Sequence, residues 1–290
     1  MSLSLRLLNL LLRWTARPSV ARARNPGVER RRFASAARFL HRPAHLCFLD
    51  GPLPRVTCHL TNDTHAVLYF HGGAYITGSP ETHLTITGRL ARLTGLPVFA
   101  PRYPLAPEHP APAAFDAALA AHERLSRIYP WQNIILGGDS AGGGLALALM
   151  SHLCQTGRPP AGLFAFSPWT DLTLGGESLL TNADSDVLLP AHRVAEAATL
   201  VRGTLAPTDP RISPLFAAFP DPPPVLIQTG TTEVLRDDAR RMTKVLGARL
   251  SEWPDCPHVW QMFDGYLPEA RAALREVAAF VAHLADRTVR

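Results

Sequence analysis

The feature that most constrains this chain is a strand-like run that passes straight into a helix-like segment through a glycine-rich turn. The run Asn133–Leu136 leads into the pentapeptide Gly138–Gly142 (Gly-Asp-Ser-Ala-Gly), and an apolar, alanine- and leucine-rich segment follows. A Gly-x-Ser-x-Gly pentapeptide in this context predicts a sharp strand-to-helix turn with the hydroxyl of Ser140 exposed at its tip. The helix that begins there would aim free backbone N–H groups, chiefly that of Ala141, at an anion formed beside the serine.

Strand-like and helix-like segments alternate along most of the chain. Further strand-like runs lie at His65–Phe70, Pro97–Tyr103, Gly162–Ser167, Val225–Thr229 and Ala248–Trp253. Helix-like segments separate several of these runs, which predicts an α/β fold with a doubly wound, mostly parallel central sheet flanked by helices. With 290 residues and 47% hydrophobic content, the chain can bury a large core. An exposed edge strand near the C-terminal part of this sheet is a candidate contact for a homodimer.

The N-terminal segment, residues 1–45, differs in charge from the rest of the chain. It holds ten arginines against Glu29 alone, a net charge of +9, so a chain of net charge +5 leaves −4 for the remainder. Such a segment fits a surface that binds a membrane or nucleic acid, and its composition also fits a targeting presequence. The leucine-rich run Leu7–Leu12 is too short to span a bilayer, so we expect no stable membrane insertion.

Helical spacing favours another reading of this segment, an amphipathic helix folded onto the catalytic domain as a cap. One helical face carries Leu7, Leu8, Leu11 and Trp14, and another carries Ser2, Arg6, Asn9 and Arg13. We prefer the cap, and therefore expect no nucleic-acid partner.

The cysteines indicate a reducing compartment. Cys47, Cys58, Cys154 and Cys256 are widely scattered, with no Cys-x-x-Cys spacing. We therefore expect no structural disulfide, no metal site and a cytoplasmic location.

A serine nucleophile needs a general base and an acid that orients the base. In hydrolases with the sharp serine turn, these residues follow in the order serine, acid, histidine. His258 lies in the loop after the last strand-like run, and it is the strongest candidate for the base. Glu233 lies just past the run Val225–Thr229, at the carboxyl end of a parallel strand where open sheets place their sites. Asp237 is the second candidate for the acid, although it also fits a helix cap.

The backbone after the run His65–Phe70 is the candidate oxyanion hole. Small residues at Gly72, Gly73 and Ala74 let N–H groups approach a substrate carbonyl closely, and we expect Gly73, Ala74 and Ala141 to be the donors. Gly72 has a supporting role. Four large side chains are candidates for an apolar substrate pocket, and each fits an ordinary core position equally well. They are Tyr75, Trp169, Trp260 and Met262.

Several motifs in the right order extend this pattern. They are His71–Ala74, Tyr103–Pro110, Gly138–Gly143, Ser167–Leu172 and Asp209–Leu215. Together with the acid and histidine loops they resemble the hormone-sensitive-lipase-like branch of the α/β-hydrolases, the bacterial family IV carboxylesterases. The resemblance runs from about residue 60 to the C-terminus.

The resemblance implies an α/β-hydrolase fold with a small helical cap and a serine carboxylesterase for short- or medium-chain esters, without a cofactor. Ser140 would attack, His258 would shuttle the proton and Glu233 would orient the imidazole. Residues 1–45 would form the N-terminal cap, and residues 46–290 the catalytic domain with a second cap insertion at about 181–207. The alternative is a non-catalytic ligand-binding protein on the same scaffold, which the presence of His258 disfavours.

Two positions depart from the family pattern. The third glycine of the oxyanion motif is Ala74, whose N–H donor is retained without strain unless its φ is positive. The acid position is Glu233, where many relatives use aspartate. Asp139, beside the nucleophile, is assigned no part in proton transfer.

Overall fold

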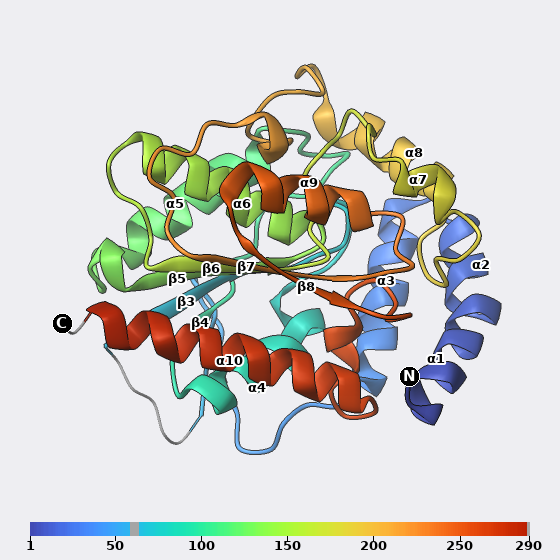
Figure 1. Ribbon diagram of the computed structural model, residues 1–290, viewed down its shortest axis with the longest axis horizontal. Helices are drawn as coiled ribbons and strands as arrows, with labels where there is room; N and C mark the ends of the chain where they lie inside the picture. The colour runs from blue at the N-terminus through green and yellow to red at the C-terminus, as the bar shows by residue number, and fades with distance from the viewer. Residues whose placement is uncertain (59–63, 289–290) are drawn as a thin grey trace.

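The computed structural model describes residues 1–58 and 64–288, and it has the predicted α/β architecture (Figure 1). Eight strands form one sheet in the order β1-β2-β4-β3-β5-β6-β7-β8. The strands are β1 (Cys47–Leu49), β2 (Arg55–Thr57), β3 (Ala66–Phe70), β4 (Val98–Phe99), β5 (Ile134–Asp139), β6 (Gly162–Phe166), β7 (Val225–Gly230) and β8 (Arg249–Trp253). Strands β3 to β8 are mutually parallel, whereas β2 pairs antiparallel with both β1 and β4. The sheet is therefore mostly parallel, as expected.

Helices cover both faces of the sheet, which explains why the central strands are continuous apolar runs. Helices α5, α6 and α9 pack on one face, and α4 and α10 pack on the other (Figure 1). Every residue of β3, β5, β6 and β7 is buried between these layers. The helices are α1 (Leu3–Trp14), α2 (Ala16–Ala21), α3 (Pro26–Ala36), α4 (Leu84–Thr94), α5 (Ala113–Leu125), α6 (Ala141–Gln155), α7 (Ser178–Thr181), α8 (Ala191–Arg202), α9 (Arg236–Leu246) and α10 (Pro268–Thr288). Short 3-10 helices are η1 (Ala37–Phe39), η2 (Pro80–His83), η3 (Trp131–Asn133), η4 (Pro214–Phe216) and η5 (Trp260–Phe263).

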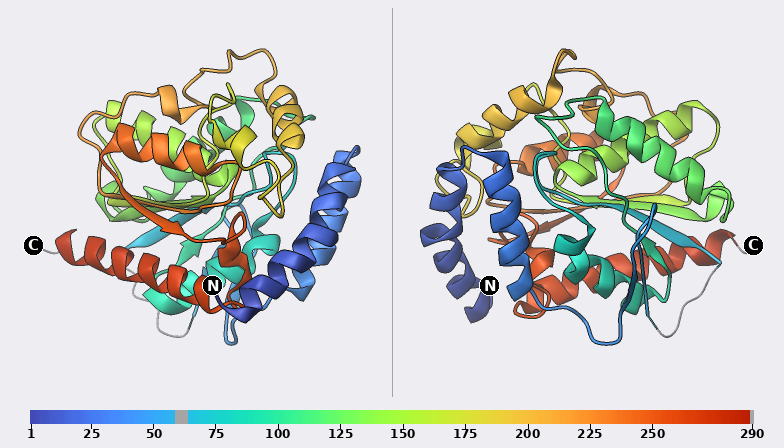
Figure 2. Two further views of the ribbon diagram at one scale, coloured as in Figure 1. Left: turned by 45° about the vertical axis from the view of Figure 1, so that its right-hand side comes forward. Right: turned by 180° about the vertical axis from the view of Figure 1, so that it is seen from behind.

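The three N-terminal helices form an arm along one side of the molecule (Figure 2). Helix α1 begins where the Ser2 hydroxyl accepts a hydrogen bond from the N–H of Leu5, and Ser2 also bonds Glu269 of α10. Leu5 is fully buried against Trp260 of η5 and Ala270 of α10. The N-terminal segment is therefore a folded part of the molecule.

The predicted assignment of faces on α1 is wrong. Leu5 and Leu12 are the buried residues of the helix, whereas Leu7, Leu11 and Trp14 of the expected apolar face are exposed. Leu8 alone among that set packs against the protein. A polar residue explains the difference. Asn9 donates to the carbonyl of Asp255, and this bond holds the face that carries Leu5 and Leu12 against the rest of the molecule.

No helix within the described part of the chain is long and apolar enough to cross a membrane. All four cysteines are free thiols. Among residues 1–58 and 64–288, no cluster of His, Cys, Asp or Glu side chains has the arrangement of a metal site.

Candidate active site

Ser140 stands at the junction between β5 and α6. Its backbone has φ 52° and ψ −123°, a conformation that side-chain-bearing residues rarely adopt. Two glycines make this turn possible. A Cβ on Gly142 would lie 2.1 Å from the carbonyl oxygen of Phe70, and one on Gly138 would lie 2.4 Å from that of Gly142. The structure therefore has the tight, strained turn that the pentapeptide predicts.

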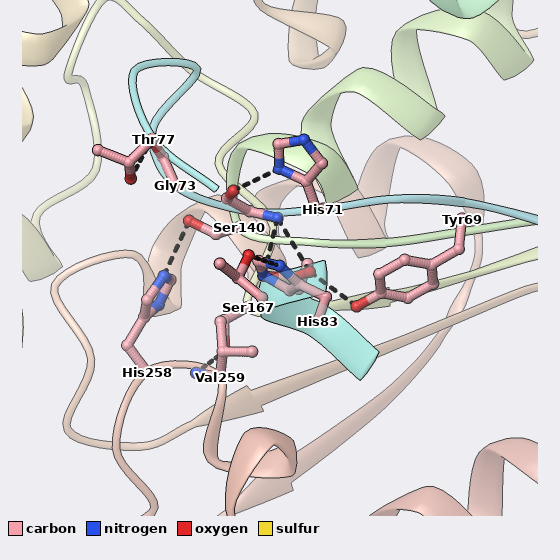
Figure 3. A network of polar contacts seen from close by, with 12 residues as sticks. Tyr69, His71, Gly73, Thr77, His83, Ser140, Ser167, His258 and Val259 are labelled. Atoms are coloured by element: carbon pink, nitrogen blue, oxygen red, sulfur yellow. Dashed lines mark hydrogen bonds and ion pairs between the residues drawn. The ribbon is translucent and has the colours of Figure 1, made fainter. Parts of the chain in front are cut away.

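The structure brings Ser140, His258 and Glu233 together in a single hydrogen-bonded chain. The Oγ atom of Ser140 lies 2.9 Å from Nε2 of His258 (Figure 3), and Nδ1 of His258 lies 2.7 Å from Oε2 of Glu233. All three side chains are buried, and they come from three different strand ends. Such an arrangement can remove a proton from the serine hydroxyl as that oxygen attacks an electrophile.

The second oxygen of Glu233 is fixed by donors from two neighbouring strands. Its Oε1 atom accepts a hydrogen bond from the hydroxyl of Ser167, at 2.7 Å, and another from the N–H of Gly230. Ser167 in turn accepts a hydrogen bond from the N–H of Val259, next to the histidine. Sequence reasoning missed this role of Ser167. The signal was its position directly after β6, at the same sheet edge as Ser140.

Three backbone N–H groups near Ser140 are free to stabilise an anion. Within residues 1–58 and 64–288, the N–H groups of Gly73, Ala74 and Ala141 have no hydrogen-bond partner. The carbonyl of Gly73 accepts bonds from the N–H groups of Ile76 and Thr77, which closes the loop. The φ angle of Ala74 is 54°, so alanine occupies the left-handed region here, at a cost of about 1–2 kcal/mol.

A buried polar network joins this loop to the nucleophile turn. One oxygen of Asp139 accepts hydrogen bonds from the N–H of Gly72, at 3.0 Å, and from the hydroxyl of Tyr69, at 2.7 Å. The other oxygen lies 3.3 Å from Nε2 of His83. Burial by itself would raise the pKa of Asp139, but the His83 and Tyr69 contacts outweigh it and hold that pKa below its ordinary value. The N–H of Gly72 is thus occupied, which gives Gly72 an anchoring role.

His71 belongs to the scaffold of the same loop. Its Nδ1 atom lies 2.8 Å from the carbonyl oxygen of Gly72, and its ring stacks on that of Tyr103 at 4.3 Å. Burial, with the charge of His83 nearby, lowers the pKa of His71 to about 3. His71 is therefore neutral near pH 7 and holds the loop by hydrogen bonding.

Comparison with known proteins identifies the family. A family model described as the alpha/beta hydrolase fold matches residues 67–262. The chain belongs to the α/β-hydrolase family.

Individual relatives show to which branch of the α/β-hydrolase family the chain belongs. The chain is 38% identical over 229 residues to an acetyl-hydrolase of Streptomyces hygroscopicus, and 38% identical over 230 residues to an esterase of Acinetobacter venetianus. Each alignment covers 76% of both chains. The crystal structure of an esterase from the bacterial hormone-sensitive lipase family superposes with a TM-score of 0.91 at 34% identity, over 98% of this chain and 99% of that one. The structure of EstE5 superposes with a TM-score of 0.93 at 30% identity, over 99% and 100%. The predicted membership of the hormone-sensitive-lipase branch is confirmed.

The second acid candidate of this α/β-hydrolase lies outside the hydrogen-bonded chain. Asp237 accepts a hydrogen bond from the N–H of Ser178 at 2.9 Å and pairs with Arg236. It thus joins the first turn of α9 to the segment that contains α7. The structure brings Glu233, and not Asp237, to the histidine.

The same segment clamps the loop that carries Glu233. Asn182 donates from its side chain to the carbonyl oxygen of Glu233 at 2.8 Å, and the carboxylate of Asp186 accepts from the N–H of Val234 at 2.9 Å. Sequence reasoning missed both residues, because each lies about 50 positions away from the loop that it holds.

The proposed pocket residues divide into two groups. Trp169 donates its backbone N–H to the carbonyl of Ser140, and its ring lies 6.4 Å from that of Tyr75. The hydroxyl of Tyr75 and the indole N–H of Trp169 are buried without a partner in the part of the chain that the structure describes. The pocket prediction is wrong for Trp260 and Met262. Trp260 packs in the core with Leu5 of α1, and Met262 is partly buried against the hydrophobic cluster that α4 and α10 form with the sheet.

The charge state of His258 depends on Glu233. Burial alone would lower the pKa of His258, but the hydrogen bond and the negative charge of Glu233 outweigh it and raise that pKa above its ordinary value of 6.5. The carboxylate therefore favours the protonated form of His258.

Proposed function

We propose that this α/β-hydrolase is a serine carboxylesterase that cleaves short- to medium-chain esters through an acyl-enzyme at Ser140. The observation that carries the proposal is the unbroken hydrogen-bonded chain from Ser140 through His258 to Glu233. The relatives named esterase and acetyl-hydrolase support the same reaction class. The alternative, a non-catalytic binding protein, does not need this buried series of hydrogen bonds.

The reaction proceeds through two tetrahedral intermediates. Oγ of Ser140 attacks the ester carbonyl carbon while Nε2 of His258 takes the hydroxyl proton. The carbonyl oxygen becomes an oxyanion, which accepts hydrogen bonds from the free N–H groups of Gly73, Ala74 and Ala141.

The first intermediate collapses when its C–O bond to the alcohol breaks and His258 protonates the departing alkoxide. A water molecule then attacks the acyl-enzyme, giving its proton to His258, and the carboxylic acid leaves as Ser140 recovers its proton. Glu233 holds the Nδ1–H of the imidazole throughout. The chain's own side chains perform every step, and we predict that no cofactor is required.

The short- to medium-chain range rests on the similarity to esterases of the hormone-sensitive lipase family. A small cavity lies beside the helix that follows Ser140. Its walls include Tyr75, Phe115, Leu145, Val201 and Ile212. Leu145 lies on α6 and Val201 on α8, so the pocket is bounded by both the catalytic core and the segment at about 181–207. We also propose that residues 1–45 and about 181–207 form the cap.

Activity-based labelling tests the central proposal. A fluorophosphonate probe is expected to label the folded protein, and Ser140→Ala is expected to abolish the labelling. Ser151→Ala is the matched control, because Ser151 is a buried serine on the same helix that bonds only the backbone and Gln155. Wild-type protein that is folded but unlabelled would favour the binding-protein alternative.

A series of 4-nitrophenyl esters from acetate to octanoate tests the chain-length range. We expect kcat/KM to fall beyond the medium chains, and a maximum at long chains would contradict the proposed acyl range. A cytoplasmic location and a homodimer through the free edge of β8 stay predictions. The dimer is tested by light scattering across a concentration series.

A further inference from the structure

The outer face of α1 is apolar and uncovered. Its residues at positions 3, 7, 10, 11 and 14 fall within an arc of about 100° at 3.6 residues per turn. These residues are Leu3, Leu7, Leu10, Leu11 and Trp14, and each is between 55% and 77% exposed. Figure 2 shows α1 on the outer margin of the molecule. Because the opposite face is already docked through Leu5 and Leu12, this second face has no role in folding the chain.

The N-terminal segment that carries this face is rich in exposed arginines. Arg6 and Arg13 lie beside the apolar arc on the helix, and further exposed arginines follow in the same segment. These are Arg22, Arg24, Arg31, Arg32, Arg38 and Arg42. In the described structure, Arg6, Arg22, Arg31, Arg38 and Arg42 have no acidic partner. The arm thus offers apolar side chains and unpaired positive charge together.

We infer that α1 binds flat on an anionic phospholipid surface, with its leucines and Trp14 inserted at the boundary between headgroups and acyl chains. Amphipathic helices with an arginine-rich border and leucine or tryptophan on the other face bind membranes in this way. Tryptophan favours the headgroup level, and arginines near the surface attract anionic lipids. The 12 residues of α1 extend about 18 Å, so the helix lies on the bilayer and does not span it.

Charge favours a lipid surface over a second copy of the chain. A two-fold interface brings the same patch together from both protomers, and here it would oppose two arms of net charge +9 each. Stable interfaces are depleted of charge at their centre, and like charges across them are unfavourable. An anionic surface neutralises the same charge.

The docked helix touches the catalytic loops directly. Asn9 of α1 donates to the carbonyl of Asp255, in the loop that carries His258. Arg17 of α2, the next helix of the arm, donates to the carbonyl of Ala183, in the segment that clamps Glu233. The membrane-bound protein would therefore hold these loops about one helix diameter, roughly 10 Å, from the headgroups.

Vesicle co-sedimentation of the full chain tests the inference. We expect binding to vesicles of phosphatidylcholine with 30% phosphatidylglycerol, weak binding to pure phosphatidylcholine, and loss of binding in 0.5 M NaCl. Leu7→Glu is expected to lower the partition coefficient at least tenfold. Arg6→Gln and Arg22→Gln are expected to lower it about fivefold each. Ile128→Glu is the matched control, since Ile128 is an equally exposed aliphatic residue far from α1, and it should bind as the wild type does.

Unchanged melting temperatures would show that the variants are folded, because all four positions are at the surface. The inference is overturned if the wild type does not bind phosphatidylglycerol vesicles, or if Leu7→Glu binds as well as Ile128→Glu. It is also overturned if Leu7→Glu turns a dimer into a monomer without changing vesicle binding, since a second copy of the chain would then cover the face.

Discussion

Replacing Glu233 by glutamine should inactivate this hydrolase by fixing the wrong tautomer of His258. Oε1 of Glu233 accepts hydrogen bonds from the Ser167 hydroxyl and the Gly230 N–H, and Oε2 faces Nδ1 of His258. In Glu233→Gln, the single carbonyl oxygen must serve the two donors, so the NH2 group turns toward Nδ1. Nδ1 then becomes an acceptor, the proton moves to Nε2, and His258 can no longer take the proton of Ser140.

The size of the effect follows from the alternative amide orientation. Turning the carbonyl toward Nδ1 restores the active tautomer but points the NH2 group at the two donors, at a cost of about 2 kcal/mol for each lost hydrogen bond. A penalty of about 4 kcal/mol corresponds to a loss of roughly 10³-fold in rate. Weaker stabilisation of the imidazolium adds to it, so we expect kcat to fall by about 10³–10⁴-fold, in the range known for an acid-to-amide change in a serine triad.

Asp237→Asn is the matched control, a carboxylate-to-amide change four residues away. Asp237 bonds Ser178 and Arg236 and does not bond His258, so we expect its kcat to stay within about threefold of the wild type. Both variants are assayed with 4-nitrophenyl butyrate under steady-state conditions after their melting temperatures are compared. The reasoning is refuted if Glu233→Gln stays within about tenfold of the wild type, or if Asp237→Asn loses more than about 10³-fold.

Three further results are expected. The kcat/KM profile should rise with pH through a pKa above 6.5, because neutral His258 is the base and Glu233 raises its pKa; a midpoint below 6.5 would contradict this. Asp139→Asn should lower kcat by about 10–100-fold and change KM little, because the anchor of Gly72 weakens and the oxyanion donors lose their position. An equal rise in KM would instead indicate a damaged pocket. Leu5→Ala should destabilise the protein by about 2–3 kcal/mol in urea unfolding, whereas Leu7→Ala should change stability by less than about 0.5 kcal/mol. Similar losses for the two would argue against the observed docking face of α1.

The central strands could be predicted from sequence because burial on both faces leaves a continuous apolar signature. Runs of this kind located β3, β5, β6 and β7 to within a few residues, except that β5 continues through its glycines to Asp139. There the pairing with β3 and β6 outweighs the low strand preference of glycine. Strands β1 and β2 were not predicted, since they are short, partly exposed and stabilised mainly by pairing at the sheet edge.

The candidate site, like the sheet, could be predicted only in part from the sequence. Ser140, His258 and Glu233 were predictable because each follows a strand signal in the chain order of this family. Ser167 and Asn182 were not, because their roles depend on which strand ends become neighbours. The prediction of which face of α1 is docked was wrong for a related reason. Helical periodicity shows that a helix has an apolar side, but the partner decides whether that side is docked, and here the docked side is held by Leu5 with Ser2 and Asn9.

Two adjacent strands hold the proposed nucleophile and the proposed oxyanion donors in register. Phe70 of β3 pairs with Gly138 of β5, so the loop after β3 and the turn after β5 leave the sheet side by side. The Asp139–Gly72 hydrogen bond then joins them just past the last pair, one residue beyond Gly138 and two residues beyond Phe70. Both segments contain a strained residue. The φ angles of Ala74 and Ser140 are positive, and each such conformation costs of order 1–3 kcal/mol. Strands β3 and β5 are fully buried and most of α6 is buried, so packing on both faces of the sheet holds these conformations. The proposed catalytic geometry therefore stands at the ends of strands that are buried along their whole length.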